Sequence, residues 1–227
     1  MVRQAEVAVK EIEECDTGEG HRKWHTCFDC GQRFHGAVRL ALGWACWKTY
    51  LGRPVTDSRR CIALGVIGNG LWSGAERPQE ALPVLEAYLA LRRRYWSHDT
   101  NSVFIAQSNV AGCLDSLGRF EEALVLEREI YARHVAKFGV LHEGTIVSGL
   151  NLSITLNKSK RWGEGLQFVR DLLPEARKLL GADHDATLDL NQNLAAAIVN
   201  GSNGTRDKLL EAVTIMRDVV QRRRRVF

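Results

Sequence analysis

The chain has 227 residues, of which 45% are apolar and 26% charged, a composition typical of a globular protein with a substantial buried core. It contains no run of eighteen apolar residues and no apolar leader in its first fifteen, so the sequence predicts neither a membrane span nor a secretory signal. We therefore expect a cytoplasmic protein, and the small net charge of +4 disfavours a chain devoted to nucleic acid.

Charge is unevenly distributed along the sequence. Residues 1–20 are acidic, residues 21–60 are basic, and a further basic cluster runs from Arg222 to Arg225. A basic cluster can hold phosphate or an acidic partner, but on a helix it is more often a solvated face. We favour the solvated face and keep nucleic-acid binding through the basic head and tail as an alternative.

The first motif in chain order is HTCFDCGQRFHG, residues 25–36. Cys27 and Cys30 have the C-x-x-C spacing by which two thiolates bind one tetrahedral zinc ion, and His35 follows in the form C-x2-C-x4-H. The segment resembles a degenerate zinc finger of the PHD, RING or MYND type. The resemblance implies one zinc ion, for which Cys15 could supply the fourth ligand of a Cys3His set. The alternative is a small hydrophobic lid in which the cysteines pack.

The next stretch, residues 36–54, predicts a buried helix, because apolar residues recur through GAVRLALGWACWKTYLGRP. Cys46 lies among these residues and is expected in the core rather than on a metal. We therefore predict a first domain over residues 1–55, which joins the acidic N-terminus, the Cys/His-rich segment and this helix. Residues 56–227 are predicted to form about four helical repeats.

Those repeats have a period of forty-two residues. At that spacing Asn109, Asn151 and Asn193 coincide, and Phe120 pairs with Trp162. Such internal repetition is the signature of arrays of stacked supersecondary units. The first repeat is diverged around GNGLWSGAERP, and the fourth carries an insertion, GSNGTRDK.

Each repeat is predicted to be a pair of helices. An apolar stripe at helical spacing begins at Trp162, and small residues recur where two helices must approach closely, such as Ala123, Gly165 and Ala212. A single hairpin of this kind cannot bury its own stripe, so the hairpins stack into a solenoid with a concave inner surface.

The pattern N-L-A…L-G-R-F-E-E-A, seen here over residues 109–123, resembles the tetratricopeptide repeat. The forty-two-residue period and the linker GADHDATLDLNQNLA, residues 181–195, are similar to the kinesin light chain subtype. The resemblance implies an all-α fold: a solenoid of tetratricopeptide-repeat helical hairpins wound as a right-handed superhelix.

The resemblance also implies a binding surface. In tetratricopeptide proteins the first helix of each pair lines the groove, and an asparagine of this motif commonly bonds the backbone of a bound extended peptide. Carried over, this makes Asn109, Asn151 and Asn193 candidate peptide-binding residues, and an amide suits the role because it both donates and accepts. The alternative is that these asparagines cap or bridge neighbouring helices.

No enzyme is expected, because the sequence contains no G-x-S-x-G elbow, no phosphate-binding loop and no H-E-x-x-H zinc motif. We interpret the chain as a non-enzymatic adaptor or scaffold that binds a peptide of another protein in the repeat groove. The alternative from another class is a zinc-finger-dependent regulatory protein, either a ubiquitin ligase or a chromatin reader. The sequence predicts neither the partner's identity nor the oligomeric state.

Overall fold

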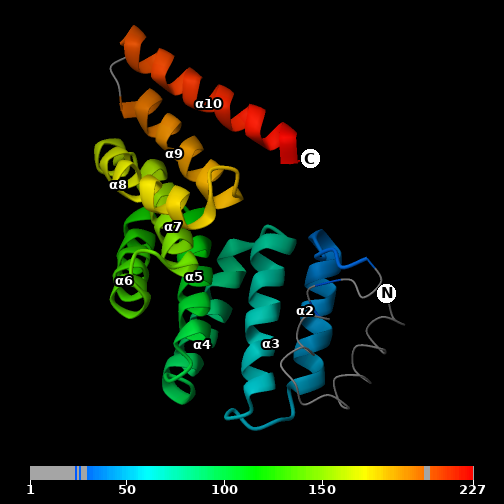
Figure 1. Cartoon of the computed structure of the whole chain (residues 1–227). Helices are drawn as coiled ribbons and strands as arrows, with labels where there is room; N and C mark the ends of the chain where they lie inside the picture. Colours follow the sequence, from blue (N-terminus) through cyan, green and yellow to red (C-terminus); the bar gives the residue numbers. More distant parts are fainter. Residues whose placement is uncertain (1–23, 25, 27–29, 202–204, 227) are drawn as a thin grey trace. The chain divides into compact units, whose positions relative to one another are not determined.

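The computed structural model describes residues 24, 26, 30–201 and 205–226 of the chain, and their chain path is drawn in Figure 1. Helices account for nearly all of the regular structure in this part, and beside them it holds only an isolated antiparallel bridge between Thr26 and Arg33. The all-α prediction is therefore confirmed. The chain divides into two compact units, Met1–Gly118 and Arg119–Phe227.

The first unit is a succession of helices in which each packs on the next along the chain. They are α2 (Gly36–Tyr50), α3 (Ser58–Asn69), the π-helical turn η2 (Gly70–Gly74), α4 (Pro78–Tyr95) and α5 (Thr100–Ser116). Helix α2 packs on both α3 and η2. Their shared core includes the buried side chains of Trp24, Cys46, Tyr50 and Val66. The core position of Cys46 is thus confirmed. A helix does lie within the stretch 36–54, but it ends at Tyr50 and buries only one face, since Trp44 is 45% exposed.

Two glycines allow the backbone of α2 to lie in close contact with the backbones of α3 and η2. A Cβ added at Gly43 would lie 3.0 Å from the Cα of Ile67, and one added at Gly70 would lie 3.1 Å from the Cα of Leu40. Backbone atoms cannot move aside as a flexible side chain can, so a larger residue at either position would push the elements apart.

The second unit contains α6 (Phe120–Phe138), α7 (Glu143–Lys158), α8 (Trp162–Leu180), α9 (Asp185–Gly201) and α10 (Arg206–Val226). Helix α6 packs on α7, α7 on α8, α8 on α9 and α9 on α10, and α9 also contacts α7 (Figure 1). The pairs α7–α8 and α9–α10 are the helical hairpins that the forty-two-residue period predicts.

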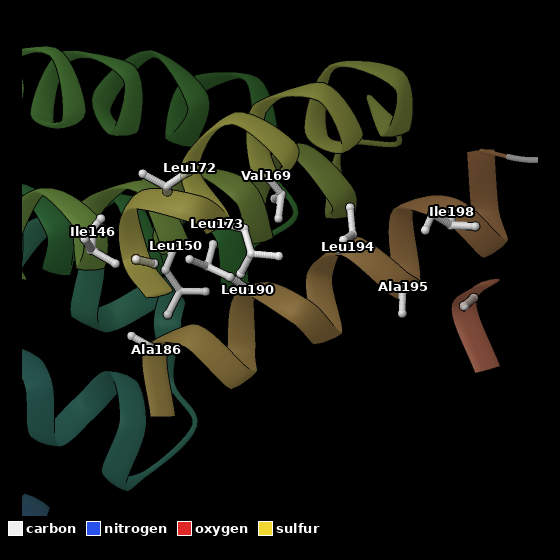
Figure 2. Close-up of a cluster of buried hydrophobic side chains, with 12 residues drawn as sticks. Ile146, Leu150, Val169, Leu172, Leu173, Ala186, Leu190, Leu194, Ala195 and Ile198 are labelled. Atoms are coloured by element: carbon white, nitrogen blue, oxygen red, sulfur yellow. The ribbon is translucent and has the colours of Figure 1, made fainter. Parts of the chain in front are cut away.

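A large core of the second unit lies where α9 meets α7 and α8 (Figure 2). Most of its members come from these three helices and include Ile146, Val169, Leu173, Leu190 and Leu194. Each such side chain contributes about 1.5–3 kcal/mol by leaving water. The apolar stripe of one hairpin is therefore covered by the first helix of the next, which explains why the hairpins stack.

The links that lead into the α7–α8 and α9–α10 hairpins use the same types of residue. Helices α6 and α8 both end at a glycine with positive φ, Gly139 at 79° and Gly181 at 90°, a conformation that side-chain-bearing residues rarely adopt. At the start of the following helices, the Nδ1 of His142 accepts a hydrogen bond from the backbone N–H of Gly144, and the Nδ1 of His184 accepts one from Ala186. These histidines act as helix N-caps.

Among the residues that the structure describes, no helix is long and apolar enough to cross a membrane. The predicted domain boundary at residue 55 stays a prediction.

Candidate functional site

The three predicted peptide-binding asparagines each lie on the first helix of a repeat and are half-buried. Asn109 is on α5 in the first unit, whereas Asn151 on α7 and Asn193 on α9 belong to the second. Helices α7 and α9 are in contact, so the second unit brings two of the three onto neighbouring helices.

Asn193 already takes part in a link between repeats. Its Nδ2 donates to the Oγ of Ser153 on α7 at 3.0 Å, and its backbone carbonyl accepts from the Nδ2 of Asn157 at 2.9 Å. The Ser153 hydroxyl in turn donates to the carbonyl of Leu150. The side chain of Asn193 therefore bridges α9 to α7, as the structural alternative for this residue predicts. Within the described residues its Oδ1 accepts no hydrogen bond.

A second amide on α9 joins this helix to α8. Asn191 is buried at 5% exposure, donates to the carbonyl of Thr187 and accepts from the guanidinium of Arg177 at 3.1 Å. Burying a polar side chain without partners would cost about 1–3 kcal/mol. The bond to Arg177 therefore favours the packing of α9 on α8 over any packing that would leave the Asn191 amide without a partner.

An apolar groove of about 750 Å³ runs between α9 and α10. Among its lining residues Ala195 and Ala212 are buried, whereas Met216 and Val220 are exposed. Arginines and amides stand along its length. The lining residues are Gln192, Ala195, Ala196, Val199, Asn200, Ala212, Val213, Met216, Arg217, Val220, Gln221 and Arg224. None of the sequence motifs described above predicts this groove.

The buried cysteines have little chemical reactivity. Burial raises the pKa of the Cys46 thiol to about 12 and those of Cys61 and Cys113 to about 11, so all three stay protonated at neutral pH. The Cys113 thiol donates to the carbonyl of Pro78 at 3.3 Å, which ties α5 to the start of α4. These thiols are packing groups, since the thiolate is the nucleophilic form.

The predicted zinc ligands fall partly outside the described residues, where Cys15 and Cys27 lie. Cys30 is exposed, and so is His35, which stands at the N-cap position of α2. Within the described part of the chain, no three His, Cys, Asp or Glu side chains gather as a metal site would need. Two exposed donors alone do not make the four-ligand set of a structural zinc ion, so the Cys3His site stays a prediction.

No protein-family model matches the chain, and no curated protein matches it. Solved structures of helical-repeat proteins do match. A single-substitution variant of a kinesin light chain-like protein of Podosopora anserina, with nearly identical TPR-like repeats, aligns over 99% of this chain and 94% of its own, with a TM-score of 0.69 and 15% identity. A second structure of that protein has a TM-score of 0.67, 15% identity, and coverage of 99% and 95%. The fold is of the tetratricopeptide type.

The structure of BtubC (BKLC) from P. vanneervenii is also similar, with a TM-score of 0.65 and 12% identity over 82% of this chain and 73% of the other. Identities this low speak for the fold alone, so function has to be argued from the residues of this chain.

Proposed function

We propose that the protein is a non-enzymatic protein–protein interaction scaffold that binds an extended peptide of a partner along the first helices of its repeats. The observation that carries this proposal is the placement of Asn151 and Asn193 on neighbouring first helices of one helical-hairpin stack. The forty-two-residue period extends the same role to Asn109 in the first unit.

The amide chemistry suits a peptide backbone. Asn193 keeps its Oδ1 available while its Nδ2 holds Ser153, so it can accept a hydrogen bond from a backbone N–H without releasing α7. A side chain already held in this way loses little conformational freedom on binding, which favours affinity. Asn151 offers both a donor and an acceptor to the next peptide group.

Nucleic-acid binding receives less support from the basic tail. Arg222 pairs with Asp183 and Asp218, and Arg223 pairs with Asp189, so half of the Arg222–Arg225 cluster is engaged in ion pairs within the unit. Arginines that hold helices together in this way are less available to phosphates. The zinc-dependent alternative rests on Cys15 and Cys27, which lie outside the described residues.

The experiment is a peptide-display selection on the full chain, followed by calorimetric affinity measurements on the selected peptides. We expect Asn151→Ala to weaken binding by about two- to tenfold, the value of one hydrogen bond, and Asn109→Ala, made separately, tests the first unit for the same role. The matched control is Gln167→Ala, which removes an exposed amide from the second helix α8. Equal affinities for all of these variants would refute recognition along the first helices.

A further inference from the structure

The groove between α9 and α10 repeats a surface that is covered one hairpin earlier. Helix α10 aligns with α8 at a shift of 47 residues, which sets Met216 in the place of Val169 and Val220 in the place of Leu173. Val169 and Leu173 are 0% and 6% exposed because α9 lies over them, whereas Met216 and Val220 are 36% and 44% exposed. Within the described residues, α10 thus presents the apolar stripe of α8 without the helix that covers it.

A ladder of ion pairs, one between each two consecutive second helices, recurs at the same repeat position. Arg128 on α6 pairs with Glu164 near the start of α8, and Arg170 on α8 pairs with Glu211 near the start of α10. The shift of 47 residues that aligns α8 with α10 leads from Arg170 to Arg217, which lines the groove. No carboxylate of the described residues pairs with Arg217, so its guanidinium can pair with an acidic group of a bound molecule.

A second arginine, about two turns further along α10, repeats the pattern. In the preceding repeat, Arg177 donates to the Oδ1 of Asn191 on the covering helix. The shift of 47 residues places Arg224 at the corresponding position of α10, where it lines the groove and is exposed. Nothing in the described part of the chain accepts a hydrogen bond from the Arg224 guanidinium.

We propose that the α9/α10 groove binds an amphipathic, acidic helix of another protein, which lies on it as α9 lies on α7 and α8. The template for this helix is α9 itself, whose Leu190, Leu194 and Ile198 recur at four-residue spacing, with Asn191 beside Leu190 facing Arg177. The partner helix therefore has a stripe of the form L-[D/N]-x-x-L-x-x-x-[I/L], with a carboxylate or amide for Arg224. This site is distinct from the peptide-binding face of the proposed function and does not depend on it.

The positive charge beside the groove favours another protein, rather than a second copy of this chain, as the molecule that occupies it. A twofold contact through the groove would use the same patch on both molecules. It would bring the Arg217 and Arg224 side chains of the two copies to one seam, together with the other arginines of the Arg222–Arg225 cluster. Like charges across an interface cost several kcal/mol, whereas an acidic helix would be attracted to the same residues.

The test uses a labelled peptide with the α9 sequence, residues 185–201, in which Asn191 is replaced by aspartate. Its ends are blocked and its solvent face is stapled, because an isolated helix of this length is marginal in water. Binding to the full chain is followed by fluorescence anisotropy. We expect Arg224→Glu to weaken binding by about tenfold or more, and a peptide carrying Asn191→Lys to prefer the Arg224→Glu protein.

The matched control is Arg225→Glu, which makes the same charge change at an exposed residue that does not line the groove. Selective weakening by Arg224→Glu, with rescue by the lysine peptide, would establish the site. Equal weakening by both variants would mean attraction to net charge and would overturn the proposal, as would no binding up to about 1 mM peptide. So would a concentration-dependent dimer in sedimentation that excludes the peptide, because it would assign the groove to a second copy.

Discussion

Replacing Leu190 with alanine tests whether the packing of α9 against α7 and α8 holds the second unit together. Leu190 is 0% exposed and lies in the cluster to which all three helices contribute. Removing a buried leucine side chain beyond Cβ costs about 2–5 kcal/mol, because the cost of the cavity adds to the lost apolar burial. Ile146, Val169 and Leu194 of the same cluster belong to three separate helices, so the cavity can close only if helices shift. We therefore expect about 3 kcal/mol or more.

The assay is urea unfolding of the full chain followed by far-ultraviolet circular dichroism. With a denaturant dependence of about 1–3 kcal/mol per molar, such a loss moves the midpoint of the affected transition by about 1–3 M. The control is Leu179→Ala on α8, where the leucine is 40% exposed and the expected cost is below about 1 kcal/mol. If the two variants had the same stability, the account of how the hairpins stack would be refuted.

Three further results are expected. A double-mutant cycle of Ser153→Ala and Asn193→Ala should give a coupling of about 0.5–1.5 kcal/mol in urea unfolding, and additive effects would mean that the bridge contributes nothing. Asp57→Ala removes the N-cap of α3 and should cost about 1 kcal/mol at neutral pH. Although burial opposes it, hydrogen bonding led by Arg53 holds the pKa of Asp57 below its ordinary value, so this stabilisation should be lost as the pH falls through that lowered pKa; a difference between variant and wild type that persists in acid would contradict this. Elemental analysis should find near-stoichiometric zinc in the wild type and none in Cys27→Ser; protein purified without chelator that holds no zinc would make the Cys/His-rich segment a packed lid.

The helical hairpins could be predicted from sequence because their determinants recur at a fixed spacing. Gly165 shows why a small residue is needed: a Cβ added there would lie 3.1 Å from the Oδ1 of Asn157 and 3.5 Å from the Cβ of Leu156. Every hairpin meets the same constraint where its two helices cross, so the same type of residue returns. Local constraints of this kind are visible in one sequence without knowledge of any long-range contact.

The diverged first repeat could not be predicted, because its divergence has a non-local cause. Where GNGLWSGAERP departs from the pattern, the chain forms the turn η2 and places Trp72 against α5. The indole Nε1 donates to the Oγ of Ser116, and the ring lies where a Cβ at Gly112 would come within 2.4 Å. Gly112 and Trp72 are forty residues apart, so neither explains the other until the structure joins them.

The α9/α10 groove lies between these two cases. The stripe of Val213, Met216 and Val220 on α10 is visible in the sequence once α10 is aligned with α8, and so are Arg217 and Arg224. An apolar stripe on a helix normally indicates a buried face, and the alignment alone would have placed these residues in the core. Their exposure depends on whether another helix packs against α10, which no local pattern encodes. The apolar residues of α10 are exposed although their counterparts on α8 are buried, and Arg217 and Arg224 lie beside them although their counterparts on α8 are paired. Together these differences point to a binding surface, which the residue types alone would have assigned to packing.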